Sequence, residues 1–188
     1  MGLTEIRWHG RGGQGAVTVS ELFAEAAILE DNYIQAFPEF GPERMGAPIK
    51  AFTRICDTPI TVHSQVYTPD IVVVLDPTLL GQVDVTEGLS ENGILIVNSP
   101  RDADDIKKML DFSGKVYSLD ATKIALETIG RAVANTSCAG ALVKVSGLIK
   151  LENLETVTRE KFKPKLPQKA IDANIAAIKA SYEGVKNE

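Results

Sequence analysis

This sequence has few of the residues from which metal clusters and disulfide frameworks are built. It contains 2 cysteines, Cys56 and Cys138, which form no C-x-x-C pair and have no flanking pair of histidines. Such a chain is not expected to be a disulfide scaffold or to hold a metal site, and it cannot house an iron–sulfur cluster by itself. A reducing compartment is then the default, and we predict a cytoplasmic protein.

Positive charge and long apolar runs are also scarce. The formal net charge is −5 at pH 7, which predicts no nucleic-acid-binding surface. No apolar run approaches the roughly 20 residues that a membrane helix needs. The N-terminus enters a predicted strand directly, without the apolar region of a signal peptide. The 188 residues suit one domain with a substantial core, which we predict to span residues 1–188.

The order of the predicted elements favours an α/β protein, a three-layer α/β/α domain with a mostly parallel sheet. Residues 70–75 and 93–98 are continuous apolar runs, typical of strands buried on both faces. Residues 49–55 alternate instead, which predicts a half-exposed strand at an edge of the sheet. Further strands are expected near Ile6, near Tyr33 and over 115–119. We expect helices over 16–30, 103–110, 121–134, 139–149 and 168–184, which makes the C-terminal third helical.

A glycine-rich segment is the most informative motif. Strand residues ending at His9 run into Gly10-Arg11-Gly12-Gly13-Gln14-Gly15, and an amphipathic helix follows. Glycines allow a tight turn and a close approach of the backbone to a ligand. The first helical turn adds unpaired N–H donors and the positive end of the helix dipole. The motif therefore predicts a site for phosphate or another anion.

The spacing Gly10-x-Gly12-x-x-Gly15 also satisfies the dinucleotide fingerprint, but the other half of that fingerprint is missing. A nicotinamide site would place an Asp or Glu at the end of the second strand, and here that strand is Tyr33–Phe37. Two alternatives stay open: the chain is a free-standing nucleotide-binding protein that uses the loop alone, or the glycines serve only to pack strand against helix.

A second unusual loop spans residues 37–48 and contains prolines, glycines and one basic residue, Arg44, close to Gly46. Pro and Gly in such density are typical of a shaped turn rather than a flexible linker. Arg44 can direct its planar cation at a carboxylate or phosphate. The alternative is an ordinary surface ion pair with Glu39 or Glu43.

At this point the chain resembles the gamma subunits of the 2-oxoacid:ferredoxin oxidoreductase family, and within it those of pyruvate:ferredoxin oxidoreductase. The resemblance covers essentially the whole chain. It is carried by these segments: 10–15, Phe40-Gly41-Pro42-Glu43-Arg44-Met45-Gly46-Ala47-Pro48, Ala51-Phe52-Thr53-Arg54, 70–76, Asn135-Thr136 and Asn174. The form of the second loop is closer to the pyruvate and branched-chain members than to the 2-oxoglutarate type.

The resemblance implies an enzyme that decarboxylates a 2-oxoacid on thiamine diphosphate and passes the acyl group to coenzyme A. Electrons would leave through [4Fe-4S] clusters to ferredoxin. Thiamine diphosphate, Mg²⁺ and the clusters would belong to partner alpha, beta and delta subunits. The present chain would be a non-catalytic gamma subunit that helps to close the active site.

From the resemblance and the loops together we predict no catalytic residue and no metal ligand in this chain. The residues expected to contribute to a coenzyme A site are Gly10, Arg11, Gly12, Gly13, Gln14, Gly15, Arg44 and Gly46. His9 is interpreted as a structural residue, because a lone histidine at a strand end is more often structural than catalytic. A scaffold subunit that binds no ligand is the remaining alternative, and neither the 2-oxoacid nor the number of gamma copies follows from the sequence.

Overall fold

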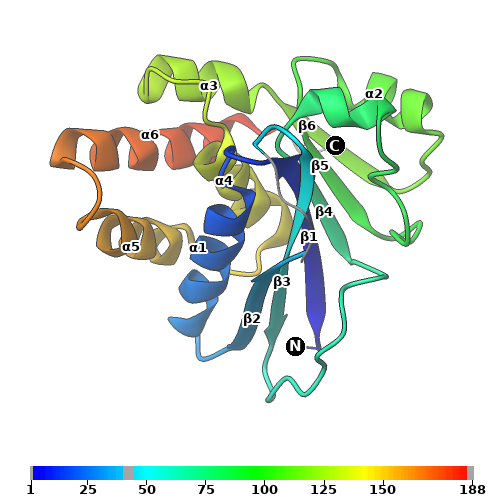
Figure 1. The fold of residues 1–188 in the computed structure, drawn as a ribbon, viewed down its shortest axis with the longest axis horizontal. Helices are drawn as coiled ribbons and strands as arrows, with labels where there is room; N and C mark the ends of the chain where they lie inside the picture. The colour runs from blue at the N-terminus through cyan, green and yellow to red at the C-terminus, as the bar shows by residue number, and fades with distance from the viewer. Residues whose placement is uncertain (1, 40–44, 186–188) are drawn as a thin grey trace.

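A six-stranded sheet forms the centre of the protein (Figure 1). The computed structural model describes residues 2–39 and 45–185, and its strands lie in the order β2-β3-β1-β4-β5-β6. They are β1 (Thr4–Arg11), β2 (Tyr33–Pro38), β3 (Pro48–Cys56), β4 (Ile71–Val74), β5 (Ile94–Asn98) and β6 (Lys115–Leu119). β1, β4, β5 and β6 pair in parallel, whereas β3 is antiparallel to both β1 and β2. The α/β class with a mostly parallel sheet is confirmed.

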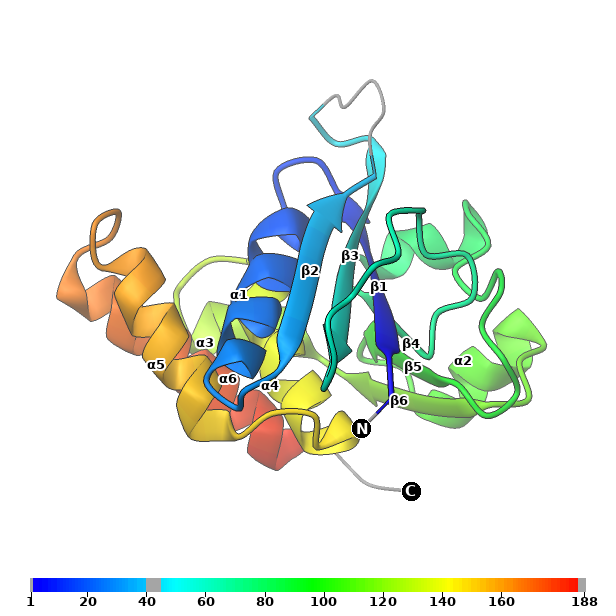
Figure 2. The ribbon, with the colours of Figure 1, turned by 90° about the horizontal axis from the view of Figure 1, so that it is seen from below.

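One face of the sheet, the helix-covered face, carries two tiers of helices (Figures 1 and 2). α1 and α4 pack directly on the strands, and α3, α5 and α6 pack on those two helices or on each other. The bounds are α1 (Ala16–Ile28), α3 (Ala121–Thr128), α4 (Asn135–Ser146), α5 (Leu151–Phe162) and α6 (Gln168–Gly184). Trp8 and Phe23 meet edge to face in this core, with ring centroids 6.0 Å apart. None of the described helices is long and apolar enough to cross a membrane.

The second face of the sheet has a thinner cover. A short helix, α2 (Ala103–Leu110), and a 3₁₀ turn, η1 (Pro77–Gly81), close a small apolar cluster over β4, β5 and β6. Over β1 and β3 the cover is irregular chain. Two buried arginines donate hydrogen bonds to its carbonyl groups. Arg7 donates to the carbonyls of Val85 and Glu87, and Arg54 donates to three carbonyls of residues 62–65. Guanidinium groups satisfy carbonyls that a helix would have paired internally.

The predicted position of one strand is wrong. β3 is an interior strand between β2 and β1, and all its residues from Ala51 to Cys56 are buried. The alternation of polar and apolar residues along β3 does not reflect exposure to solvent, because its polar side chains have hydrogen-bond partners inside the protein. Thr53 Oγ1 accepts from Trp8 Nε1 and donates to the carbonyl of Ser20, and Arg54 lies 2.7 Å from Glu5. Paired polar groups can be buried without the cost of an unmet hydrogen bond.

The buried character of the two apolar runs is confirmed. Every residue of β4 is buried, and so is every residue of β5 except Ile94, which is half-buried. These strands have apolar cover on both faces, from α4 and its neighbours on one side and from α2 and η1 on the other. The predictions for 103–110, 115–119 and 168–184 also match the observed elements.

Several helix boundaries differ from the prediction. α1 ends at Ile28 rather than residue 30, and α3 ends at Thr128, because the chain turns through Gly130 with a φ of 76°. α4 begins at Asn135 rather than residue 139 and ends before Gly147, which adopts the left-handed conformation that closes many helices. Glycine tolerates a positive φ that other residues avoid, and this is why α3 ends before Gly130 and α4 ends before Gly147.

Candidate functional site

The glycine-rich segment forms a tight turn between β1 and α1. The N–H of Gln14 donates to the carbonyl of Arg11 at 3.0 Å, and Gly13 has a φ of 93°. A positive φ at the third of four residues is typical of a type II turn, which favours glycine at that place. In return, Gln14 Oε1 accepts from the N–H of Arg11 at 2.8 Å. The turn is therefore shaped by the chain itself and needs no ligand to form.

This turn leaves a group of backbone donors without partners. Gly15 is the N-cap of α1, with a φ of 78° and no side-chain cap. The first N–H in the helix that bonds backward is that of Val19, to Gly15. Among residues 2–39 and 45–185, the structure shows no acceptor for the N–H groups of Gly13, Gly15, Ala16, Val17 and Thr18. Free donors at a helix N-terminus favour an anion.

A second helix N-terminus lies against the same turn. Asn135, the first residue of α4, contacts Gly15: its Nδ2 lies 3.5 Å from the Gly15 carbonyl, and a Cβ on Gly15 would lie 2.4 Å from that nitrogen. The next residue, Thr136, donates to Asn174 of α6 at 3.1 Å. Asn135, Thr136 and Asn174 are all buried. Asn135 and Thr136 are the first two residues of α4.

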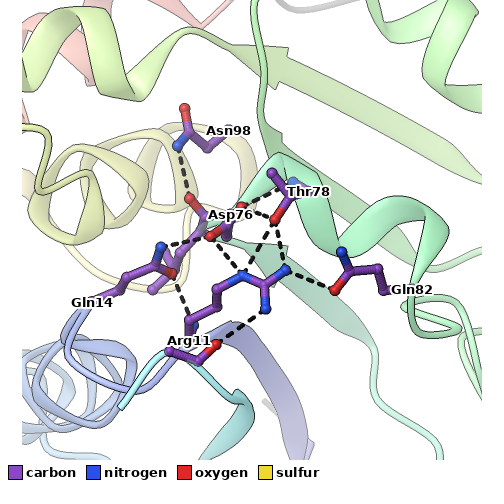
Figure 3. A network of polar contacts seen from close by, with 8 residues as sticks. Arg11, Gln14, Asp76, Thr78, Gln82 and Asn98 are labelled. Atoms are coloured by element: carbon purple, nitrogen blue, oxygen red, sulfur yellow. Dashed lines mark hydrogen bonds and ion pairs between the residues drawn. The ribbon is translucent and has the colours of Figure 1, made fainter.

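Arg11 bridges the gap between the carboxyl ends of β1 and β4 (Figure 3). Its guanidinium bonds Asp76 at 3.1 Å, Thr78 at 2.8 Å, Gln82 at 2.8 Å and the carbonyl of Gly46 at 3.1 Å. The connection after β1 runs over the helix-covered face and the connection after β4 over the second face, so this gap is the switch point of the sheet. Open α/β sheets bind ligands at such points.

Asp76 is the centre of this network. It accepts from Gln14 Nε2 at 2.6 Å, and from both the N–H and the hydroxyl of Thr78 at 2.9 and 2.7 Å. Burial alone would raise the pKa of Asp76, but the hydrogen bonds from Thr78 and Gln14 and the charge of Arg11 outweigh it and hold the pKa below its ordinary value. Asp76 is therefore ionised at neutral pH and neutralises Arg11.

Beside this network lies a hollow of about 180 Å³ at the carboxyl ends of β4 and β5. Its lining residues are Gln14, Leu75, Asp76, Pro77, Asn98, Thr122, Ala132 and Ala134. Asn98 is committed to structure: its Nδ2 donates to the carbonyl of Leu75 and to Thr122 Oγ1, and its Oδ1 accepts from the N–H of Thr122. The polar part of the lining is thus fixed by hydrogen bonds within the chain, and the apolar part consists of Leu75, Pro77, Ala132 and Ala134.

The glycine turn meets the described end of the second loop. The N–H of Gly12 donates to the carbonyl of Ala47 at 2.9 Å, and the N–H of Gly46 donates to the carbonyl of Gly12 at 3.1 Å. Arg44 and Glu43 lie outside the described residues, so the two interpretations of Arg44 both stay predictions. The other proposed partner, Glu39, lies 3.7 Å from Lys50.

The expected site residues therefore fall into two groups. Gly12, Gly13, Gly15 and Gly46 form the adjoining turns. Gly10 precedes them near the end of β1, where a Cβ would lie 3.3 Å from Ala16 and 3.4 Å from Leu75. Arg11 and Gln14, which we predicted as ligand contacts, make hydrogen bonds with other residues of the chain, and their role as ligand contacts stays a prediction. Sequence reasoning gave no role to Asp76, Thr78 or Gln82; the one signal was a polar residue, Asp76, directly after a buried strand.

Other reactive side chains are placed as inert groups. His9 is buried between Lys50 of β3 and Val74 of β4, and burial, together with the charges of Arg7 and Lys50, lowers its pKa to about 3. Burial raises the pKa of Cys138 to about 12, so its thiol stays protonated. In the part of the chain that the structure describes, no group of three or more His, Cys, Asp or Glu side chains could hold a metal ion.

The geometry also bears on the dinucleotide alternative. A nicotinamide site needs its acidic residue on a strand next to the first one, where it can reach the ribose. Here the neighbours of β1 are β3 and β4, and β2, the second strand in the chain, lies two places away. The acidic residue that follows β4, Asp76, is already hydrogen-bonded to Arg11, Gln14 and Thr78. The fold and the loop thus define an α/β protein with a turn of unpaired backbone donors at its switch point.

Comparison with known proteins identifies the family. The model of the family described as pyruvate ferredoxin/flavodoxin oxidoreductase matches residues 5–184. The chain is 51% identical over 182 residues to pyruvate synthase subunit PorC of Thermotoga maritima, covering 97% of this chain and 94% of that protein. It is 50% identical over 182 residues to the common gamma subunit of the pyruvate and ketoisovalerate oxidoreductases of Pyrococcus abyssi, covering 96% of each chain.

A crystal structure agrees with these sequence relatives. Pyruvate oxidoreductase subunit PORC from Thermotoga maritima superposes with a TM-score of 0.87 at 47% identity, covering 99% of this chain and 98% of that one. The protein belongs to the pyruvate ferredoxin/flavodoxin oxidoreductase family, and it is of the gamma-subunit type. The resemblance inferred from the sequence is confirmed.

Proposed function

We propose that this chain is the gamma subunit of an enzyme that oxidatively decarboxylates pyruvate or a related 2-oxoacid to an acyl-coenzyme A, and that its glycine turn contributes to the coenzyme A site. The observation that carries the proposal is the set of free N–H groups of Gly13 and of Gly15 to Thr18 at the start of α1. Coenzyme A carries a diphosphate and a 3′-phosphate, so its binding needs backbone donors and cations more than catalytic side chains.

In this proposal the residues of the turn have different roles. Gly13 and Gly15 let the backbone approach the phosphates, since both have a positive φ and neither has a Cβ in the way. Arg11, neutralised by Asp76, holds the turn against η1 and the base of the second loop rather than binding phosphate directly. Arg44, in that second loop, supplies the cation in this proposal.

The remaining parts of the reaction belong to partners in this proposal. Thiamine diphosphate with Mg²⁺ and the [4Fe-4S] clusters are held by alpha, beta and delta subunits, and ferredoxin accepts the electrons. The gamma chain covers the active site and contributes no catalytic residue. The same gamma chain can serve enzymes that act on different 2-oxoacids. Support for the last point comes from the Pyrococcus abyssi relative, whose name describes a subunit common to pyruvate and ketoisovalerate oxidoreductases.

Gly13→Val in the assembled enzyme is expected to raise the KM for coenzyme A about tenfold, the equivalent of one charge-assisted contact. The valine Cβ blocks the approach of a phosphate, and the positive φ of Gly13 is strained for any other residue. Arg44→Ala should have a similar effect. The measurement is coenzyme A-dependent pyruvate oxidation, with coenzyme A-independent decarboxylation followed in parallel and expected to stay largely unchanged.

Gly147→Val is the matched control for this experiment. Gly147 also has a positive φ and open space around it, but it lies at the opposite end of α4 from the turn. The control should share the backbone strain and keep the wild-type KM. If Gly13→Val and Arg44→Ala both assemble and retain wild-type coenzyme A kinetics, the loops are structural and this part of the proposal fails.

The isolated chain is expected to show no pyruvate- and coenzyme A-dependent reduction of a viologen dye under anaerobic conditions. The reason is that the groups able to bind thiamine diphosphate and clusters are assigned to the partners. Adding the chain back to an enzyme that lacks it should restore turnover. Robust turnover by the pure chain would contradict the non-catalytic role.

A further inference from the structure

β2 leaves one long edge of the sheet without a partner. The N–H of Glu39 donates to the carbonyl of Lys50 at 2.9 Å, which fixes the pattern of bonds between β2 and β3. Because hydrogen-bonding positions alternate along a strand, the odd-numbered residues of β2 make backbone hydrogen bonds with β3. The even-numbered residues direct their N–H and C=O groups outward, away from β3. Pro38, which has no N–H, falls at an outward position. Within the described residues, the backbone groups of Ile34 and Ala36 have no partner on this edge.

This edge lacks the protection that sheets normally give to exposed strands. The six residues of β2, Tyr-Ile-Gln-Ala-Phe-Pro, include no charged side chain, whereas the other edge strand, β6, begins with the exposed Lys115. An uncharged edge strand rich in apolar residues invites pairing with another strand. β2 lies in the foreground of Figure 2, between α1 and the segment that follows β3.

The residues of β2 are self-complementary about Gln35. Ile34 and Ala36, both apolar, flank it, and the aromatic residues Tyr33 and Phe37 follow at equal distance on either side. We propose that β2 pairs antiparallel with β2 of a second copy of this chain, across a two-fold axis at Gln35. In this register Ile34 lies opposite Ala36 of the other copy, and the outward N–H and C=O groups of both residues bond reciprocally. Each dimer gains four backbone hydrogen bonds.

Side chains fit this register on both faces. On the helix-covered face the larger Ile34 lies opposite the smaller Ala36. On the second face Tyr33, whose exposed fraction is 49%, lies opposite Phe37, which already contacts Phe52 at 5.3 Å between ring centroids. Aromatic pairs across strands stabilise sheets. A hollow of about 420 Å³ beside β2, lined by residues 34–37, Arg54 and His63, leaves room for the incoming aromatic ring.

Charge also favours a second copy at this edge. Two copies of a chain with a net charge of −5 repel each other over most of their surfaces. β2 brings no like charges together, because none of its residues is ionisable at neutral pH. Exposed Ile28 and Leu29, at the end of α1 that leads into β2, extend the apolar surface. The inference goes beyond the proposed function and does not depend on coenzyme A binding.

Ala36→Pro tests the pairing, because the N–H that it removes points outward and is not used within the chain. The wild-type full chain is expected to sediment as a dimer at micromolar concentration. The variant should dissociate with a constant at least about thirtyfold higher, since each dimer loses two backbone hydrogen bonds. The circular dichroism spectrum of the monomer and its melting temperature, extrapolated to low protein concentration, should be nearly unchanged. The reason is that proline is tolerated at outward positions of edge strands.

A cysteine at the axis tests the register without relying on that variant. With Cys56 replaced by serine, Gln35→Cys places two thiols directly opposite each other, at a Cα separation of about 4.5 Å that a disulfide can span. Oxidation should then give a covalent dimer. The matched control, Tyr33→Cys in the same background, should not cross-link, because positions 33 of the two copies lie roughly 13 Å apart in this register.

The same variants in the intact enzyme complete the test. Gln35→Cys should cross-link two gamma chains there, and Ala36→Pro should lower the number of gamma chains per assembly or loosen their contact. The proposal is overturned if the wild-type chain stays monomeric at a concentration of about 100 micromolar and Gln35→Cys also fails to cross-link. It is equally overturned if Ala36→Pro releases a different subunit, or if Tyr33→Cys cross-links and Gln35→Cys does not.

Discussion

Replacing Gly140 with alanine is expected to lower the free energy of unfolding by about 2–3 kcal/mol, as overpacking of a tight interior does. Gly140 lies where α4 crosses α6. A Cβ there would lie 2.2 Å from the carbonyl oxygen of Ile178, 2.9 Å from its carbonyl carbon and 3.0 Å from its Cα. These are backbone atoms of a helix, so α6 itself has to move. The better helix propensity of alanine, about 1 kcal/mol, offsets only part of that cost.

Urea unfolding of the full chain measures this effect. Gly184→Ala is the matched control, because Gly184 is the last residue of α6 and a Cβ there would meet no atom within 4 Å. That substitution should leave stability unchanged or raise it by up to about 1 kcal/mol. Movement of α6 would also stretch the bond between Thr136 and Asn174, so Gly140→Ala should disturb the start of α4 beside the glycine turn. Equal stabilities for the two variants would show that the crossing adjusts freely.

Acidification is expected to cost the protein about 2 kcal/mol of stability at pH 5 through His9 alone. The pKa of His9 is about 3 in the folded chain and 6.5 in the unfolded chain. Below pH 6.5, therefore, His9 of the unfolded chain binds a proton, whereas His9 of the folded chain stays neutral until the pH approaches 3. Stability is fully present above pH 6.5 and declines as the pH falls toward 3. The cause is burial of His9 together with the charges of Arg7 and Lys50, which the charge of Asp84 opposes only in part.

His9→Gln isolates this contribution. The variant removes the titrating group, so its stability should fall by about 2 kcal/mol less than that of the wild type between pH 7.5 and pH 5. His63→Gln is the control, since His63 is exposed in the segment after β3. It should keep the wild-type pH dependence. Parallel pH profiles of wild type and His9→Gln would show that His9 titrates normally in the folded protein.

Local sequence patterns predicted the parts of the fold that depend on near neighbours. The continuous apolar runs of β4 and β5 indicated burial on both faces, and both strands have it. The glycine turn was predicted in its place and shape, because a tight turn before a helix requires residues that accept a positive φ. The family, too, followed from motifs spread over the whole chain.

The position of β3 and the roles of Arg11 and Gln14 were not predictable in this way. Strand order depends on which strands pair, and a polar residue in a strand looks the same whether it meets water or a buried partner. Thr53 and Arg54 have buried partners, so their strand lies inside the sheet. Arg11 meets Asp76 and Gln82, far along the chain, and its charge is used within the protein.

The sequence by itself determined the strands, the approximate places of most helices, and that a turn with free N–H groups follows β1. These are consequences of side-chain periodicity and of the conformational freedom of glycine, which act over a few residues. Only the tertiary structure decided that the carboxylate of Asp76 neutralises Arg11, that Asn135 brings a second helix terminus to Gly15, and that β2 presents an unpaired edge. Each of these depends on contacts between residues distant in sequence, which form only when the sheet order has been set.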